Sequence, residues 1–539
     1  MIFTTIFARV VTHWHLLVPS LLVVALPVPP TSTAQPGSVP SKPVRIESGL
    51  VRGVQSGGLG VFKGVPFAAP PVAERRWQPP APPESWKGVR DASSFAPACM
   101  QSGVSMPGEP APAINEDCLY LNVWTPNAQA RKPAPVLVWI HGGGWTNGAT
   151  SMPLYAGGAL AQQGIVVVTI AYRLGVLGFL AHPELSREGG GRSGNYGLQD
   201  QIAALKWVQR NIGAFGGDPK QVTIAGQSAG GMSVSLLMAS PAAEGLFHRA
   251  IAQSGGVFEP VQLAPHYLLK IAEKQGAKFA KALGAESAEQ LRALPAARLI
   301  GPESVALSHP VIEPEILPVT PYEAYRGQRQ HDVPLLLGTN AEEGTAFVAR
   351  SEIKAAGFAA GVAKQFGQLP PTILAAYPSV NDEEAARSRI NLETDLRFGW
   401  NMLTWARLHA AQAKTPVHYY RFAHQPPFPA HTPYAAWGAS HFAELWYMFG
   451  AQAQENWPWT REDKLLSSAM LDYWAAFVRT GDPNGAGRAT WPRFSAEVET
   501  RMRLAWPLQT ESLDEAGRLR AIDETYLALR KVPLPGQGQ

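Results

Sequence analysis

The stretch Phe215 to Gly231, FGGDPKQVTIAGQSAGG, limits the possible folds more than any other part of the chain. A turn at 216–219 precedes the β-branched run 222–224, and the pattern G-x-S-x-G follows with Ser228 at its centre. The apolar segment from Met232 to Met238 predicts the start of a buried helix. Strand, tight turn and helix in this order are the context of a nucleophile elbow.

The requirement for glycine at these positions has a physical explanation. The serine of an elbow occupies a strained turn, and neighbours without side chains let strand and helix approach closely. Ser228 would then project its hydroxyl at a helix N-terminus, where backbone N–H groups stabilise an oxyanion. A purely structural turn is the alternative interpretation, because glycine and serine are common and a bare G-x-S-x-G is weak evidence.

The composition is compatible with one large folded unit. Of the 539 residues, 46% are apolar and 16% are charged, which permits a large buried core. Residues 44–539 are expected to form a single domain, and residues 35–43, rich in Pro, Ser and Gly, a flexible lead-in. The net charge is only +4 and no run of Lys or Arg stands out, which argues against a nucleic-acid partner.

The first 34 residues have the features of an export signal. Arg9 precedes the apolar run Leu16 to Val28, and Ser32-Thr33-Ala34 offers small residues at the cleavage positions. The run is short for a membrane span and contains prolines, although an uncleaved anchor is the alternative. A secreted or periplasmic protein is expected, without stable membrane association after signal cleavage.

The sequence contains two cysteines, Cys99 and Cys118. An exported chain meets an oxidising compartment, so a disulfide between them is the favoured interpretation, and two free buried thiols are the alternative. Two cysteines this far apart make a poor metal site. Neither a metal nor a cofactor is expected.

Apolar strand patterns recur along the chain and alternate with helical periodicity, which is clearest over 200–212. The predicted strands are 44–55, 61–67, 119–124, 135–140, 165–171, 222–224, 249–253, 333–338, 417–422 and 501–506. This alternation predicts an α/β protein with a mostly parallel sheet covered on both faces. Residues 261–330 and 351–412 show few strand signals and are expected to form helical excursions above the sheet.

A serine nucleophile needs a base, and the base needs an orienting acid. In an α/β-hydrolase fold these groups follow the order Ser, acid, His along the chain. After the predicted strand 333–338 the chain reads Thr339-Asn340-Ala341-Glu342-Glu343-Gly344. The pattern alone does not choose between Glu342 and Glu343, and most glutamates are solvated loop acids.

Five histidines lie beyond these acids: His409, His418, His424, His431 and His441. The first falls in a helical pattern, the second in a strand, and the next two in a Pro-rich stretch. His441 lies in a loop past a late strand and precedes a predicted aromatic helix at 442–449. This position favours His441 as the base.

An oxyanion hole requires converging N–H groups. Gly142-Gly143-Gly144 follows a buried strand and provides unhindered backbone, and Ala229, directly after the nucleophile, provides another donor. A glycine-rich turn without this role is the alternative.

Together these motifs resemble the type-B carboxylesterase family, which also contains the cholinesterases. The resemblance extends from about residue 43 to 530. Phe215 to Gly230 matches the serine signature of the family, and Glu116 to Val123, EDCLYLNV, matches its second signature. The resemblance implies an α/β-hydrolase fold with helical excursions over the active site.

The resemblance also selects among the candidate site residues. Asn340 to Gly344 is similar to the acid loop of the family, in which the Glu directly before Gly is catalytic, and this implies Glu343. Gly438 to Gly450, GASHFAELWYMFG, is similar to the histidine loop and implies His441.

Further residues are implied around these groups. The oxyanion hole of the family corresponds to Gly143, Gly144 and Ala229. Gln253-Ser254-Gly255 resembles a segment whose serine supports the catalytic acid, which makes Ser254 a supporting residue.

Some features depart from the family pattern. Many relatives carry Glu immediately before the nucleophile, where this chain has Gln227, a second residue expected to support the site. Cholinesterases carry a Trp that stacks on choline, and residues 100–117 contain none. Only the first disulfide of the animal relatives has its cysteines here, which indicates the bacterial branch.

The resemblance implies a serine carboxylesterase that hydrolyses carboxylic esters through an acyl-enzyme on Ser228. One alternative is a specialised esterase that removes polycarboxylic acid side chains from a bulky natural product, such as a fumonisin-type toxin. A non-catalytic adhesion protein would be expected to lack one of the three catalytic groups, and all three motifs are intact here. An amidase is a further alternative, which the resemblance favours less.

Overall fold

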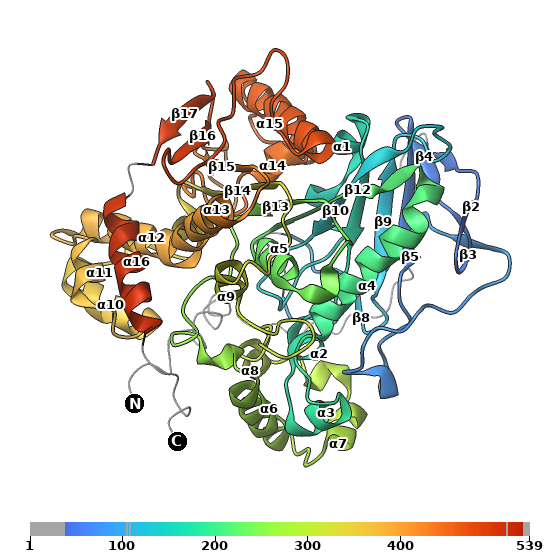
Figure 1. Ribbon diagram of the computed structural model, residues 1–539, viewed down its shortest axis with the longest axis horizontal. Coiled ribbons are helices and arrows are strands. Elements are labelled where there is room, and N and C mark those ends of the chain that lie inside the picture. Colours follow the sequence, from blue (N-terminus) through green and yellow to red (C-terminus); the bar gives the residue numbers. More distant parts are fainter. Residues whose placement is uncertain (1–37, 104–105, 107–108, 514–515, 532–539) are drawn as a thin grey trace.

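The computed structural model of the protein describes residues 38–103, 106, 109–513 and 516–531, so the predicted signal peptide lies outside it. A 12-stranded sheet forms the centre, and helices cover it (Figure 1). The strands follow one another across the sheet in the order β1 (Val39–Pro40), β4 (Val54–Ser56), β5 (Leu59–Pro66), β9 (Tyr120–Thr125), β11 (Val166–Ile170), β10 (Ala134–Ile140), β12 (Gly217–Gln227), β13 (Arg249–Gln253), β14 (Leu335–Asn340), β15 (Val417–Phe422), β16 (Thr500–Leu504) and β17 (Gln509–Ser512).

Two small sheets stand beside the large one. One contains β2 (Val44–Ile46), β3 (Gly49–Arg52) and β6 (Val89–Asp91), and the other contains β7 (Ala98–Cys99) and β8 (Ile114–Asn115). The α-helices are α1 (Gly158–Gln162), α2 (Gly175–Phe179), α3 (Pro183–Glu188), α4 (Tyr196–Asn211), α5 (Ala229–Ala239), α6 (Leu269–Ala282), α7 (Ala288–Ala293), α8 (Pro302–Val305), α9 (Pro321–Arg326), α10 (Phe358–Phe366), α11 (Pro371–Ala375), α12 (Asp382–Thr394), α13 (Trp400–Gln412), α14 (Leu445–Met448), α15 (Arg461–Thr480) and α16 (Ala516–Leu529).

The middle of the sheet is parallel and buried on both faces. The strands from β11 to β16 pair in parallel, and antiparallel pairs occur only toward the two edges. Along β10, Val136 and Val138 enter one hydrophobic core, and Leu137 and Trp139 enter the other. Because successive side chains of a strand point to opposite faces, an unbroken apolar run is what a strand between two cores requires.

Helices fill both faces. The core on one side includes apolar residues of α4, α5 and α13, and the core on the other side includes those of α14 and α15. The chain between β13 and β14 forms α6 to α9, and the chain between β14 and β15 forms α10 to α13; these are the two predicted excursions (Figure 1). The predicted α/β class with a mostly parallel sheet is confirmed.

Several boundaries differ from the sequence-based expectation. The predicted strand over 44–55 is broken into three strands, because turns at 47–48 and at Gly53 reverse or bend the chain. The predicted aromatic helix is shorter and comprises only α14. A further strand, β17, extends the sheet beyond the last predicted one. Within the predicted lead-in, Val39 and Pro40 pair with β4 as an edge strand.

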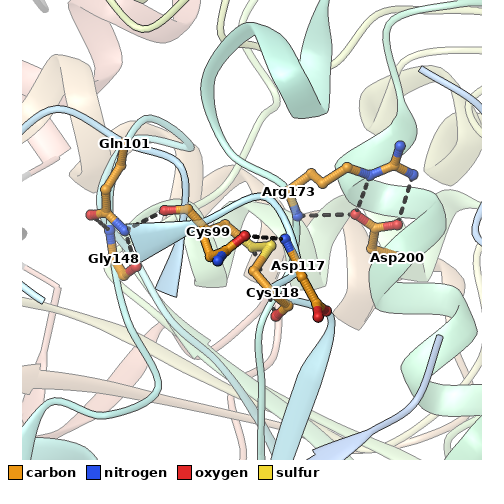
Figure 2. The surroundings of a disulfide bond; sticks show 8 residues. Cys99, Gln101, Asp117, Cys118, Gly148, Arg173 and Asp200 are labelled. Atoms are coloured by element: carbon orange, nitrogen blue, oxygen red, sulfur yellow. Dashed lines mark hydrogen bonds and ion pairs between the residues drawn. A yellow bond between two sulfur atoms is a disulfide. The ribbon is translucent and has the colours of Figure 1, made fainter. Parts of the chain in front are cut away.

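The disulfide joins Cys99, at the end of β7, to Cys118, which lies just before β9 of the large sheet (Figure 2). The Gln101 amide links this loop to the glycine-rich loop after β10: its Nε2 donates to the carbonyl oxygens of Cys99, at 3.0 Å, and Gly148, at 2.8 Å. The Gly148 N–H donates in return to Gln101 Oε1, at 2.8 Å. Nearby, the buried ion pair of Arg173 and Asp200 is closed by two 2.8 Å hydrogen bonds.

Among the helices that the structure describes, none combines the length and the hydropathy that crossing a bilayer requires.

Removal of the disulfide is expected to weaken the fold without abolishing the chemistry. The bond closes a loop with a sequence separation of 19, which corresponds to about 3 kcal/mol in the chain-entropy model. The double variant Cys99→Ala, Cys118→Ala should therefore lose about 3 kcal/mol of unfolding free energy in urea titrations. Non-reducing peptide mapping of the wild type checks the bond itself; equal stability of the two proteins would contradict the prediction.

Candidate active site

The elbow lies between β12 and α5. β12 ends at Gln227, α5 begins at Ala229, and Ser228 between them has φ 57° and ψ −127°. A positive φ is uncommon for a residue with a side chain and stores strain, which surrounding contacts must hold. The Ser228 N–H donates to the carbonyl oxygen of Gln253 at 2.9 Å, and the Met232 N–H donates to the carbonyl oxygen of Ser228 at 2.8 Å. Neighbouring strand and helix thus fix the turn from both sides.

The backbones around Ser228 lie too close for additional side chains. A methyl group on Gly230 would lie 2.0 Å from the carbonyl oxygen of Ile140, and one on Gly142 would lie 3.0 Å from Cβ of Ser228. The first of these contacts explains the last glycine of the G-x-S-x-G pattern. The second places the glycine-rich loop after β10 directly beside the elbow.

The three residues expected to form the oxyanion hole lie in the loop after β10 and at the start of α5. Gly143 and Gly144 have φ 106° and 61°, and Ala229 is the first residue of α5, where N–H groups have no intrahelical acceptor. Within the described chain, no residue accepts a hydrogen bond from these three N–H groups. Free N–H groups at such a point can bind an oxyanion.

The acid and the base form a buried pair. His441 Nδ1 donates to Glu343 Oε2 at 2.6 Å, and the exposed fractions of the two side chains are 1% and 0%. The Asn340 N–H donates to the other carboxylate oxygen, at 2.7 Å. With its proton on Nδ1, the imidazole carries no proton on Nε2, and this nitrogen can act as an acceptor.

Glu342 makes different contacts from Glu343. Its Oε2 accepts the Ala439 N–H at 2.9 Å, and its own N–H donates to the Ala439 carbonyl oxygen at the same distance. Glu342 therefore ties the acid loop to the histidine loop. The two adjacent acids, which the pattern could not separate, point in different directions, and Glu343 contacts the imidazole.

Gln227 connects the elbow to the base. Its Nε2 lies 3.2 Å from Nε2 and 3.4 Å from Nδ1 of His441. Ser228 is partly exposed, whereas Gln227 and His441 are buried. No hydrogen bond joins the Ser228 hydroxyl to the imidazole within the part of the chain that the structure describes. Such bonds are often long in free enzymes and shorten when substrate is bound.

The other late histidines occupy structural or surface positions. His409 is buried and lies 3.2 Å from the Thr415 hydroxyl. His418 is buried in β15, and burial lowers its pKa to about 4. His424 contacts Asp463 at 2.7 Å, and His431 is exposed.

A buried polar network lies behind the acid and the base. Asn340 Nδ2 donates to the Ser440 carbonyl oxygen at 2.7 Å and also to Glu444 Oε2. Gln253 Nε2 donates to Glu444 Oε1 at 3.1 Å, and Gln253 Oε1 accepts from Trp474 Nε1 at 3.1 Å. Asn340 thus contacts the acid through its backbone and the residue before the base through its side chain.

Glu444 is a second fully buried carboxyl group in this network. Burial and, to a smaller extent, the nearby charge of Glu343 raise its pKa from 4.5 to about 7. The folded protein therefore favours the protonated form of Glu444 up to near neutral pH.

The supporting role expected of Ser254 does not take the form of a direct hydrogen bond. Ser254 is buried and has φ 49°, and its N–H donates to the Gly338 carbonyl oxygen at 2.9 Å. Its hydroxyl has no hydrogen-bond partner among the described residues. The Asn340 N–H donates to the second carboxylate oxygen of Glu343.

Sequence reasoning missed three members of the network: Asn340, Gln253 and Glu444. All three lie inside motifs that it had quoted, namely the acid loop, the segment before Ser254 and the histidine loop. The polar side chains within these motifs could have indicated a buried network. Which of them hydrogen-bond to one another depends on the fold.

The chain matches the model of the family described as Carboxylesterase family over residues 40–520. It is 37% identical over 473 residues to a fumonisin B1 esterase of Sphingopyxis macrogoltabida, with 84% of each chain covered. It is 35% identical to a para-nitrobenzyl esterase of Bacillus subtilis, with 88% of this chain and 96% of that protein covered. A solved structure of a PNB esterase superimposes with a TM-score of 0.76 at 34% identity, covering 89% of this chain and 99% of the other.

Glu444 is expected to make stability depend on pH. Its pKa rises from 4.5 to about 7 on folding, so its contribution is complete below pH 4.5 and is lost as pH rises through 7. Glu444→Gln removes this titration. Between pH 5 and pH 8 the wild type should therefore lose on the order of 2 to 3 kcal/mol of unfolding free energy that the variant does not lose.

Urea unfolding of both proteins at the two pH values measures this change. Any pH-independent cost of the altered hydrogen bonds cancels in the comparison. The same difference in stability at both pH values would contradict the assignment.

Proposed function

The chain belongs to the carboxylesterase family and is a carboxylic ester hydrolase of its type-B group, and we propose that it works through an acyl-enzyme formed on Ser228. The observation that carries this proposal is the buried hydrogen bond of 2.6 Å between Glu343 and His441, whose imidazole also lies 3.2 Å from Gln227, the residue directly before the strained Ser228. A base held in one tautomer near a serine on a tight elbow is the arrangement that acyl transfer requires.

In this mechanism His441 Nε2 accepts the proton of the Ser228 hydroxyl as its oxygen attacks the ester carbonyl carbon. The negative charge that develops on the carbonyl oxygen is bound by the N–H groups of Gly143, Gly144 and Ala229. The tetrahedral intermediate collapses, the ester C–O bond breaks, and His441 returns the proton to the leaving alcohol. Water then repeats the sequence on the acyl-enzyme, releases the carboxylic acid and regenerates Ser228.

Glu343 orients the imidazole and stabilises its protonated form. Its carboxyl oxygens accept hydrogen bonds from His441 Nδ1 and from the Asn340 N–H, which hold the group in one position beside the imidazole. Glu444, the other buried carboxyl group, is held by two amides and favours its neutral form.

We propose neutral or anionic esters as substrates, with little preference for cationic alcohols. The side chain before the nucleophile is the neutral Gln227, and residues 100–117 contain no Trp that could stack on a quaternary ammonium group. The other aromatic candidates are occupied: Trp145 is 6% exposed and donates to Ser233, and Trp446 is 2% exposed and packs on Trp457.

A second candidate is a specialised esterase for polycarboxylic esters of a bulky alcohol. It is favoured by the similarity to a fumonisin B1 esterase and by a group of charges near the base. Arg389 and Arg397 share the single carboxylate of Glu393, which leaves a net positive charge. The Arg397 guanidinium lies 4.8 Å from the ring centre of Phe347, which is 5.3 Å from that of His441.

We further propose that the protein is exported from a bacterial cell and is secreted or periplasmic. The signal-like N-terminus supports this proposal, and so does the disulfide, because such bonds persist in oxidising compartments.

Substitution of the proposed triad tests the mechanism. Ser228→Ala and His441→Ala should each lower kcat for a simple ester by on the order of 10⁴-fold or more, because the groups act as a unit. Glu343→Gln should cost orders of magnitude but less than either, and Glu342→Gln, which keeps a loop contact, is the matched control. A serine-directed organophosphonate should label Ser228. Labelling of another serine, or a larger loss from Glu342→Gln than from Glu343→Gln, would refute the assignment.

Paired substrates test the specificity. The value of kcat/KM for butyrylthiocholine should not exceed that for a neutral butyryl thioester of similar alcohol size. A desolvated cation–π contact would otherwise contribute about 2 kcal/mol, or about thirtyfold. A clear preference for the choline ester would contradict the proposal. A polycarboxylic ester of a bulky alcohol that is far better than both neutral esters would favour the specialised enzyme.

A further inference from the structure

The ring of Phe398 stacks on the imidazole of His441. The ring centres are 4.5 Å apart and the planes differ by 19°, and both side chains are almost completely buried. Two other rings touch the imidazole with different geometry: Phe442 meets it edge to face at 4.3 Å, and Phe347 is tilted by 50° at 5.3 Å. Phe398 is therefore the ring that presents its face to the base.

Phe398 reaches this position from an irregular turn in a long helix. The π-helical turn η11 (Asp395–Gly399) joins α12 to α13, and helical backbone continues through both junctions. π-turns are rare and recur at functional sites. The same helix also contacts the acid loop, where the Gly344 N–H donates to Thr394 Oγ1 at 3.0 Å.

The turn is held from the far side by the C-terminal helix. Asp395 is 2% exposed and accepts hydrogen bonds from the Tyr377 hydroxyl at 2.8 Å and from Arg518 Nε of α16 at 2.7 Å. These contacts fix the start of η11, and Phe398 follows within the same turn.

We propose that Phe398 is a positioning residue that stabilises the protonated imidazole of His441 during acyl transfer. The inference rests on the proposed function, in which His441 becomes positively charged in the transition state. The face of an aromatic ring carries partial negative charge and attracts a cation most strongly where water is excluded. An aliphatic side chain of similar size would fill the space without this attraction.

The remaining charged groups near the imidazole do not replace the ring. Glu343 contacts Nδ1 from the acid loop, Glu444 favours its neutral form, and Glu342 is bonded to Ala439. Arg397, on the same turn as Phe398, is paired with Glu393 and opposes a positive charge. From β12, the neutral amide of Gln227 faces the ring nitrogens.

Two replacements test this inference: Phe398→Leu, and site-specific incorporation of 3,4,5-trifluorophenylalanine at position 398. Fluorination preserves the shape of the ring and weakens its negative face. Each should lower kcat by about tenfold with little change in KM, the effect of one desolvated cation–π contact. Each should also move the acid limb of the kcat/KM profile to lower pH, since the protonated imidazole loses a stabilising contact.

Phe347→Leu is the matched control, because that ring touches the imidazole without stacking on it, and it should change the acid limb less. Loss of packing alone would admit water and move the acid limb of the Leu variant to higher pH, since burial disfavours the charged imidazole. An unchanged kcat, or an acid limb that stays in place or moves upward, would overturn the inference. The trifluoro variant decides the question should Phe398→Leu fail to fold.

His441→Ala separates this inference from the proposed function. If that variant is inactive and the Phe398 variants behave as wild type, only the role of Phe398 is wrong. If His441→Ala keeps wild-type activity, the proposed function itself is wrong.

Discussion

The close approach of four backbone segments at Ser228 is the constraint on which the rest of the site depends. A methyl group on Gly255 would lie 2.2 Å from the Ser228 carbonyl oxygen, and one on Gly230 would lie 2.0 Å from that of Ile140. β10, β12, β13 and α5 can meet this closely only without side chains at these points. The parallel sheet supplies the rigidity that keeps Ser228 at a positive φ, and the same crowding brings the start of the glycine-rich loop, at Gly142, against Ser228.

Burial determines the electrostatics of this site. His441 and Glu343 are shielded from water, so their hydrogen bond is stronger than it would be at the surface. Ionising a second buried carboxyl group close to Glu343 would cost free energy, because the two negative charges repel each other. Glu444 accordingly favours its neutral form, and two side-chain amides hold it in place. The neutral Gln227 in place of an acid reduces the negative charge around the base further. Together these features limit the negative charge around the imidazole, which agrees with the neutral or anionic esters proposed as substrates.

The groups of the site come from distant parts of the chain, and the helical excursions hold them together. Asn340 and Ser440 are separated by 100 positions, yet a 2.7 Å hydrogen bond joins the acid loop to the histidine loop. The helix formed by α12, η11 and α13 contacts both loops, and α16 holds it in place through Arg518 and Asp395. The excursions above the sheet thus form part of the support for the base as well as a cover.

The sequence by itself determined the elbow at Ser228, the order of the parallel strands along the chain and the two loops that hold the acid and the base. These features are local, because the glycines of a tight turn and the apolar run of a buried strand can be recognised from neighbouring residues. The resemblance to a family was needed to choose Glu343 over Glu342, which differ by one position in the same loop. Only the tertiary structure decided which of them contacts His441, that the Asn340 N–H donates to Glu343, and that Phe398 stacks on the imidazole. Those contacts join segments far apart in sequence, and a buried side chain finds its partner only when the strands and helices that carry both are packed together.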